Sequence, residues 1–475
     1  MPVLLLTMIG VSSHTRSNDF DLPVLGDTAS AMISPKQEYE LGRAWLGAFR
    51  SRVRTLDDPE LQTYLENLLY DLAQHSNLHD NRLEVVIINN STLNAFAVPG
   101  GVVGVHTGLF NFSDTEDQLA SVLSHELAHL SQRHFARSLQ NNKASTMGTM
   151  AGLLAGIILA ATVGGDAGMA AMTMTQAAAL ESNLRYSRQN EQEADRIGIE
   201  TLYESGRNPA ATPAMFEKML AATRYTGQKP PEFLLTHPLT EKRVADAQGR
   251  VRSYPARQYP LLPQYHLMRA RALLWIDNNA QKSIQRFSAE LDGFTNSATA
   301  ARYGLALAQS RNGQDSLAWK TFQPLLESEP KNLIFQLAAS ELEYNGGAFD
   351  DCLQRLTELE TMHGGNYALQ RYKAETLLKL GKTQESERVL ENLSQKRPSD
   401  PEVWFELAET SGLAGDIVGV HTARAEYYIL IGVYDKAREQ LNYAKRLVGS
   451  NYRESSILDA RVVEVEALME KAKQL

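Results

Sequence analysis

The chain is nearly without cysteine and has no excess of positive charge, and each absence excludes a class of protein. Cys352 is the only cysteine among 475 residues, so no disulfide can form within the chain. The formal net charge of −9 argues against nucleic-acid binding, which requires a basic face. A chain of this length is also too long for a single hydrophobic core, and two or three domains are expected.

The N-terminal segment has the apolar core of a secretory signal but lacks the usual basic beginning. No Lys or Arg precedes the mostly apolar residues 3–9, and the small-residue pattern at 29–31 lies far downstream of them. We interpret 1–31 as a signal-like, flexible segment. The alternative is a buried strand.

The residues His125-Glu126-Leu127-Ala128-His129 form an HExxH pattern within a stretch of helical periodicity, for which Ser113-Asp114 would supply the N-cap. Residues four apart project from one face of a helix, so His125 and His129 can offer two imidazoles to one metal ion. Glu126 lies beside them, where a carboxylate can take a proton from water that the metal activates. The pattern predicts a zinc peptidase with Glu126 as the catalytic base.

Zinc in such an enzyme needs a third protein ligand, and one common solution is missing. The pattern HExxHxxGxxH would require Gly at 132 and His at 135, but the chain has Gln132 and Phe135, with His134 one residue out of register. His106, in a predicted strand, is expected to be structural.

The other common solution takes a glutamate from a later helix, and the sequence EQEAD at 191–195 offers it. We predict that Glu191 binds zinc and that Asp195, one turn further, hydrogen-bonds a histidine of the first helix and fixes its tautomer. Glu193 is expected on a solvated face. The group that stabilises the oxyanion stays open between Arg243 and a tyrosine such as Tyr186.

Taken together, these motifs resemble the HtpX and CAAX-prenyl-endopeptidase group of zinc metallopeptidases. HELAH is preceded by NAFAVPGG at 94–101 and followed by EQEAD, in the order found in that group, and 236–238 (Thr-His-Pro) is similar to its His-Pro segment. The resemblance covers roughly 90 to 243. It implies a gluzincin-type peptidase with one Zn²⁺ ion per chain.

Two interpretations of His237 stay open. Pro238 is a natural first helical residue, which favours a helix entry with the imidazole in solvent. In the other interpretation a loop brings His237 to the zinc as a tentative fourth ligand, which leaves no position for water. The resting enzyme would then be latent.

Helices are expected around the motif between 35 and 80, where apolar residues recur at three- and four-residue spacing. Residues 83–88 and 102–106 are predicted as strands joined by the turn at 99–101. An exposed strand edge beside the zinc would take up substrate as an added strand.

An apolar segment separates the two metal motifs. Residues 144–165 carry no charge, and Gly148, Gly152 and Gly156 permit close helix contact. Three interpretations stay open for 147–180: a membrane span, a helical hairpin that serves as a lid or subunit contact, and a patch that lies against a membrane.

The C-terminal half has an internal repeat. Gly313, Gly347, Gly381 and Gly415 are 34 residues apart, which is the tetratricopeptide period. Small residues follow five positions later at 318, 352 and 386, so Cys352 is interpreted as a core residue. Arrays of this kind bind other proteins on a concave face.

The predicted fold class is α+β and mostly helical. A zincin-type metallopeptidase domain with a small sheet at 32–254 precedes an all-α tetratricopeptide solenoid at 262–475. This combination with an export signal resembles bacterial periplasmic proteases, which implies a zinc endopeptidase in the periplasm. Membrane association through 147–180 stays an open alternative. Its implied substrates are misassembled outer-membrane proteins, and the repeats would dock on the barrel-assembly machinery. The alternative is a tetratricopeptide scaffold or chaperone with a vestigial zinc site.

Overall fold

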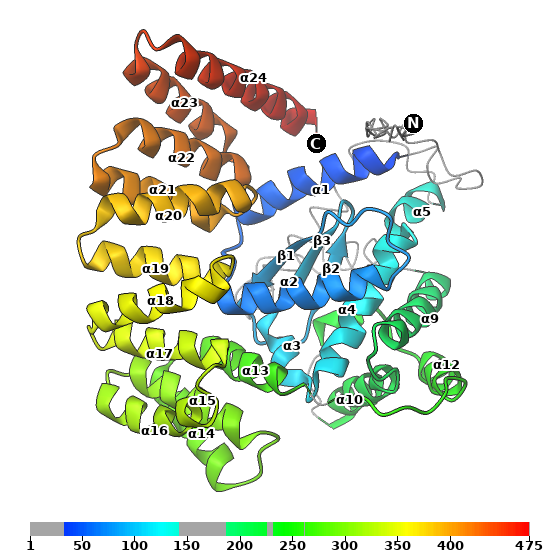
Figure 1. Ribbon diagram of the computed structural model, residues 1–475. Coiled ribbons are helices and arrows are strands. Elements are labelled where there is room, and N and C mark those ends of the chain that lie inside the picture. Colours follow the sequence, from blue (N-terminus) through cyan, green and yellow to red (C-terminus); the bar gives the residue numbers. More distant parts are fainter. Residues whose placement is uncertain (1–32, 142–186, 226–230, 261, 475) are drawn as a thin grey trace, which may run out of the picture.

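The computed structural model describes residues 33–141, 187–225, 231–260 and 262–474 (Figure 1). The expected signal-like segment 1–31, the apolar segment 147–180 and Tyr186 lie outside these residues. Within the described part of the chain, no helix combines the length and the apolar character needed to cross a bilayer.

The first half of the chain combines a small sheet with helices, as predicted. Its elements are α1 (Pro35–Arg50), α2 (Pro59–Gln74), β1 (Glu84–Ile88), β2 (Ala95–Val98), β3 (Val102–His106), α3 (Thr107–Phe112), α4 (Glu116–Ser131), α5 (His134–Asn141), α9 (Arg188–Glu204), α10 (Ala211–Tyr225), α11 (Glu232–Thr236) and α12 (Glu241–Val251).

The sheet has three strands in the order β1-β3-β2, with β3 parallel to β1 and antiparallel to β2. The strands expected at 83–88 and 102–106 are confirmed, but the connection between them is corrected. The turn at 99–101 joins β2 to β3, with Gly100 and Gly101 at positive φ. β2 was not predicted because four residues are too few for a clear alternation.

The HExxH pattern lies on α4, whose N-cap is one residue later than the predicted Ser113-Asp114. Thr115 is the N-cap, and its hydroxyl accepts a hydrogen bond from the backbone of Gln118, whereas Ser113 ends the preceding helix α3. Leu119, Leu123 and Leu127 are buried along the helix face that packs into the main core. The packing of this face fixes the direction in which the histidines point.

The second half of the chain is a series of paired helices that forms a column along one side of the first half, α1 to α12, which is called the peptidase half after the sequence prediction (Figure 1). Its helices are α13 (Pro263–Ile276), α14 (Ala280–Asp292), α15 (Ala298–Arg311), α16 (Asp315–Ser328), α17 (Leu333–Asn345), α18 (Phe349–His363), α19 (Tyr367–Lys379), α20 (Thr383–Lys396), α21 (Pro401–Ala414), α22 (Ile417–Leu430), α23 (Tyr434–Val448) and α24 (Tyr452–Gln474).

The glycines of the 34-residue repeat lie where one helix of a pair turns into the next. Gly313, Gly347, Gly381 and Gly415 all have φ between 70° and 90°, a region that favours glycine. The small residues five positions later are at most 1 % exposed at Ala318, Cys352 and Ser386. The repeat interpretation of the sequence is therefore confirmed, including the role of Cys352 as a core residue.

The column is not a separate appendage, because its first helix completes the core of the peptidase half. Tyr265 on α13 is fully buried, its ring stacks on Phe110 at 6.3 Å, and its hydroxyl donates to the carbonyl of Ser113 at 2.8 Å. Asp58, the N-cap of α2, accepts hydrogen bonds from the buried Arg271 at 2.8 Å and from the indole of Trp275 at 2.7 Å.

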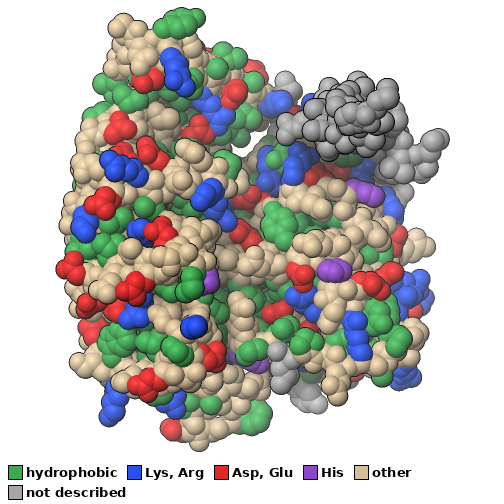
Figure 2. All heavy atoms as spheres, viewed as in Figure 1, with side chains coloured by type: hydrophobic (Ala, Val, Ile, Leu, Met, Phe, Trp, Pro, Cys, Tyr) green, Lys and Arg blue, Asp and Glu red, His purple; other side chains and the backbone are tan. Residues whose placement is uncertain are grey.

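Further contacts tie the middle and the end of the column to α1 and α2. Arg397 forms a two-point ion pair with Glu66 at 2.6 and 2.9 Å. Gly432 lies so close to the backbone of Gly47 that an added Cβ would be 2.8 Å from it. On the face shown in Figure 2 a notch lies between the far end of the column and the peptidase half, although Lys471 on α24 forms an ion pair of 3.2 Å with Glu40 on α1. The division of the chain into domains at 32–254 and 262–475 stays a prediction. It places α13 in the second domain, although this helix packs into the core of the first.

Replacing Tyr265 with alanine tests whether the two halves unfold together. We expect the free energy of unfolding to fall by about 3–5 kcal/mol, because the change empties the space of a large aromatic ring. The loss should lower the denaturant midpoint for tryptophan fluorescence and for retention of bound metal in parallel. Tyr452→Ala, at a side chain that is 85 % exposed, is the control and should change stability by less than about 0.5 kcal/mol. A metal-retention midpoint that does not move in Tyr265→Ala would show that the peptidase half folds independently.

Candidate metal centre

Two helices that cross at very short distance bring the predicted site residues together. α4 carries His125, Glu126 and His129, and α9 carries Glu191 in its first turn, after the Ser187 N-cap. At the crossing point an added Cβ on Gly198 would lie 3.1 Å from the backbone nitrogen of His125. This close approach allows short side chains from both helices to meet.

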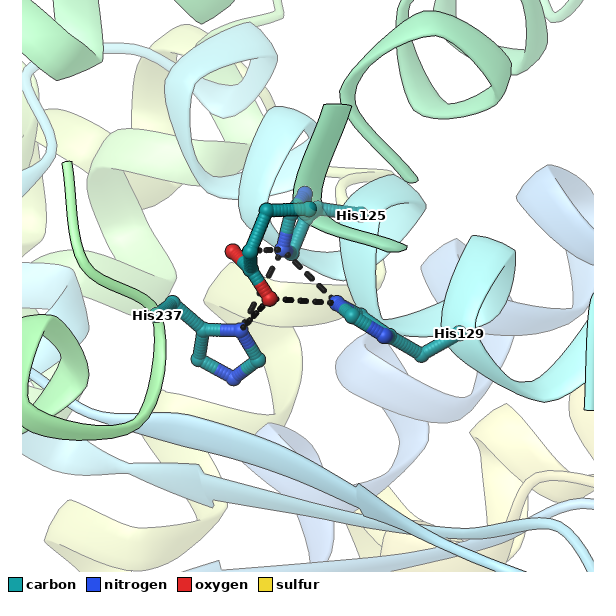
Figure 3. Close-up of side chains that lie close together, drawn as sticks. His125, His129 and His237 are labelled. Carbon is teal, nitrogen blue, oxygen red and sulfur yellow. Dashed lines mark hydrogen bonds and ion pairs between the residues drawn. The ribbon is translucent and has the colours of Figure 1, made fainter. Parts of the chain in front are cut away.

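His125, His129, Glu191 and His237 form one buried group whose ligand atoms all lie within 4.8 Å of one another. The three imidazoles converge around a glutamate carboxylate (Figure 3). Nε2 of His125 lies 3.0 Å from Nε2 of His129 and 3.4 Å from Nδ1 of His237. Oxygens of Glu191 lie 3.1 Å from His237, 3.4 Å from His129 and 3.6 Å from His125.

These distances fit a metal ion. Four ligands at the Zn–N and Zn–O distances of a tetrahedral site are separated by about 3.3 Å. The donor set of imidazoles and one carboxylate is also the set that zinc takes in peptidases. Burial alone would raise the pKa of Glu191, but His237 and His125 hold it well below its ordinary value, so the carboxylate is charged and ready to bind a cation.

Asp195 lies where it was predicted, next to a histidine of α4. Its Oδ1 is 3.1 Å from Nδ1 of His125, so the carboxylate can hold this imidazole with Nε2 facing the group. Arg243 in turn donates two hydrogen bonds of 2.7 Å to Asp195 and lies 2.8 Å from Glu191. The guanidinium is only 3 % exposed, and besides the two carboxylates it also donates a hydrogen bond of 2.8 Å to the carbonyl of Pro238.

Glu126 is 1 % exposed, and its Oε1 has no hydrogen-bond partner among the described residues. Burial raises the pKa of Glu126, and the nearby His237 and His125 oppose this shift. A carboxylate in this environment binds protons more readily than one in water, which suits a general base that must also release its proton.

His237 does not enter a helix, so that interpretation is wrong. It follows α11, is 2 % exposed, and stacks on Phe233 with ring centroids 4.6 Å apart. Its Nε2 lies 3.6 Å from Oε1 of Glu126, on the opposite side of the ring from the other histidines. The Pro238 signal failed because α12 begins only at Glu241.

The short helix α11 is fastened to the sheet by His106, as expected for a structural histidine. Thr92 Oγ1 lies 3.0 Å from Nδ1 of His106 and donates to Glu232 at 3.1 Å. The backbone of Phe233 also donates to the carbonyl of Leu93 at 3.3 Å. His106 therefore supports the loop that carries His237 without joining the group itself.

Some residues of the site were not predicted. Gly198 and the bond between His134 and His129 depend on contacts between elements and leave no local pattern. Glu193 was expected to be solvated, and although its side chain is 38 % exposed, it lies 3.2 Å from Nε2 of His134. The sequence did contain one signal for this contact, a histidine shortly after HExxH. In the structure this residue, His134, is fully buried.

Comparison with known proteins gives the family context. The family model described as peptidase family M48 matches residues 59–251, and a tetratricopeptide-repeat model matches 367–410. The chain is 34 % identical over 453 residues to the protein named beta-barrel assembly-enhancing protease of Escherichia coli strain K12, covering 95 % of this chain and 92 % of that one.

Two further relatives agree with this match. The putative beta-barrel assembly-enhancing protease of Vibrio cholerae is 32 % identical, with 96 % of this chain and 94 % of the relative covered. The mitochondrial metalloendopeptidase OMA1 of Schizosaccharomyces pombe is 32 % identical over 182 residues, which are 38 % of this chain and 50 % of that protein.

Replacing Gly198 with leucine should separate α4 from α9 and weaken metal binding. We expect zinc affinity to fall by at least about 10-fold, the effect of disturbing the groups that support metal ligands. Competition with a chromophoric chelator measures this. Gly249→Leu on α12 is the control, because an added Cβ there meets nothing within 4 Å. Equal zinc affinity in the two folded variants would contradict the role given to the crossing.

Proposed function

Because the chain belongs to peptidase family M48 and is a zinc metalloendopeptidase, we propose how its residues hydrolyse a peptide bond. One zinc ion per chain would be held by His125, His129 and Glu191. The observation that carries this assignment is the buried group with separations of 3.0 to 3.6 Å between these side chains. When bound, the ion supplies a Lewis acid that polarises the substrate carbonyl and makes water more acidic.

Glu126 is the proposed catalytic base. Its buried Oε1 would accept a proton from the attacking water and pass it to the amine that leaves. Asp195 orients His125 through Nδ1, and Arg243 holds Asp195 and Glu191 in place. Arg243 therefore takes a positioning role in this proposal, and the oxyanion stabiliser is another group.

The edge strand β2 is the proposed substrate platform. β3 covers only one of its sides in the described sheet, and the backbone of Ala97 on β2 acts to lower the pKa of Glu126, so this strand lies beside that carboxyl. A substrate segment added along the other side of β2 would bind through backbone hydrogen bonds and pass the catalytic carboxylate. This mode of binding would tolerate varied side chains.

His237 supports a latent resting state. Its ring lies between the ligand group and Glu126, with Nδ1 toward Glu191 and Nε2 toward Glu126. As a fourth zinc ligand it would fill the position that catalysis needs open. Proteolysis would then begin when the loop after α11 moves.

By similarity to the bacterial relatives, we propose that the enzyme works in the periplasm on outer-membrane proteins that fail to assemble. The tetratricopeptide array would provide contacts with such substrates or with the barrel-assembly machinery. The peptidase part would span 32–254 and the array 262–475, behind a signal-like segment at 1–31. A scaffold with a vestigial zinc site is the competing function, and the complete set of ligands, base and orienting groups disfavours it.

Glu126→Gln should abolish proteolysis and spare the metal. Glutamine cannot accept the proton, so we expect casein degradation to fall by at least about 100-fold. Zinc content measured on the same sample should stay at the wild-type value. His125→Ala, His129→Ala and Glu191→Ala should instead lose zinc. Full activity in Glu126→Gln would exclude its role as base, and full zinc content in Glu191→Ala would exclude it as the third ligand.

His237→Ala should raise basal proteolysis while zinc remains bound to the other three ligands. Removing the imidazole frees the fourth position and the face of Glu126 that it covers. Casein degradation compared at equal zinc content is the measurement. Lower activity would instead assign His237 to substrate or oxyanion binding, and unchanged activity would refute the latent state.

A further inference from the structure

His134 and Glu193 form a chain of contacts behind the metal centre that the reaction itself does not use. Nδ1 of His134 lies 2.8 Å from Nδ1 of His129, and Nε2 of His134 lies 3.2 Å from Oε2 of Glu193. The same carboxylate oxygen accepts a hydrogen bond of 3.0 Å from Arg137. Three elements, α4, α5 and α9, thus meet at a fully buried imidazole.

The direction of each hydrogen bond follows from the position of His129. Its Nε2 faces the ligand group, so Nδ1 carries the hydrogen and must donate it. Nδ1 of His134 is then the acceptor, which leaves the hydrogen of His134 on Nε2, where Glu193 accepts it. In this arrangement each donor faces an acceptor, and only the neutral form of His134 satisfies the pattern.

The backbone between α4 and α5 is specialised for this contact. Arg133, the last residue before α5, has φ of 50°, a left-handed conformation that residues other than glycine rarely adopt. Its side chain is held by Glu38 at 2.9 Å and by the carbonyl of Ile33 at 2.5 Å. The reversal folds His134 back onto His129. Unfavourable backbone conformations of this kind concentrate at functional sites.

The two histidines of α4 are consequently supported in two different ways. His125 contacts the carboxylate of Asp195 directly, and Arg243 holds that carboxylate in the interior. His129 reaches its carboxylate through a second imidazole, and the chain ends at Glu193 and Arg137, which are 38 % and 40 % exposed. Both supports end in a carboxylate bound to an arginine, but only the second reaches the surface.

We propose that His134 and Glu193 are positioning residues of the metal centre, which together orient His129 with Nε2 toward the zinc. The proposal rests on the function proposed above, because it takes His129 as a ligand. Glu193 fixes the tautomer of His134, and His134 fixes the ring of His129. Outer groups of this type commonly change metal affinity by about 10- to 100-fold.

The test measures zinc affinity of the full-length protein by competition with a chelator. His134→Phe keeps a ring of similar size but removes the acceptor, and we expect zinc binding to weaken by about 10- to 100-fold. His134→Asn places an amide oxygen where Nδ1 was, so it should retain more affinity than His134→Phe. A role in packing alone predicts the reverse order, because asparagine leaves a cavity and phenylalanine fills it. That reverse order, or affinity within about 2-fold of wild type in His134→Phe, would overturn the proposal.

Glu193→Ala provides a second variant at a partly exposed position where folding is not at risk. It should weaken zinc binding by about 10-fold, whereas Glu200→Ala, at an exposed position on the same helix, should leave it unchanged. Equal zinc affinity in these two variants would show that Glu193 has no positioning role. His129→Ala distinguishes failure of the ligand set from failure of the positioning role. If His129→Ala retains zinc, the proposed ligand set is wrong. If His129→Ala loses zinc but the His134 and Glu193 variants bind it normally, only the positioning role is wrong.

Discussion

Three imidazoles and two carboxylates cannot be buried side by side unless each is hydrogen-bonded or paired with an opposite charge, and this constraint governs the peptidase half. Removing such groups from water costs several kcal/mol for each ion that stays without a partner. Arg243 supplies the compensating charge for Asp195 and Glu191 at once. The third helix of the site, α12, is therefore required for the electrostatics of a group whose ligands lie on α4 and α9.

The same need for compensation joins the two halves of the chain. Arg271 is 3 % exposed and is surrounded by Asp58, Glu60 and Glu341, so two of these three carboxylates reach it only when the column lies against the beginning of α2. Asp58 also caps α2, which makes the beginning of this helix depend on a residue more than two hundred positions away. Hydrophobic packing of α13 adds to this contact. A solenoid attached in this way transmits any displacement of α13 directly to the peptidase core.

The sequence predicted the parts of the structure that depend on local spacing. His125 and His129 are four residues apart on a helix, and the glycines of the array recur every 34 residues, so a pattern reveals each. Glu191 was predicted because the third zinc ligand commonly comes from a later helix, whereas the position of His237 near the group was suggested by a family resemblance. Gly198, the reversal at Arg133 and the sharing of one core by α13 depend on which elements meet in space. Contacts between elements produce no periodic pattern in the sequence. The strand β2, with four residues, is too short to show a clear alternation of apolar and polar residues.

The elements around the metal centre differ in how firmly they are held, and the difference matches their proposed roles. The proposed ligands on α4 and α9 belong to long helices that cross at Gly198, so neither helix can move without unpacking the core. His237 directly follows the five-residue helix α11. This segment is held through Glu232, through the backbone and buried ring of Phe233, and through a hydrogen bond of 2.8 Å from Arg243 to the carbonyl of Pro238. In the proposed latent state, opening would break the contacts of this segment and withdraw His237, while His125, His129 and Glu191 stay on α4 and α9. Firmly held residues on α4 and α9 keep the site rigid for chemistry, while a less firmly held residue allows access to it to open and close.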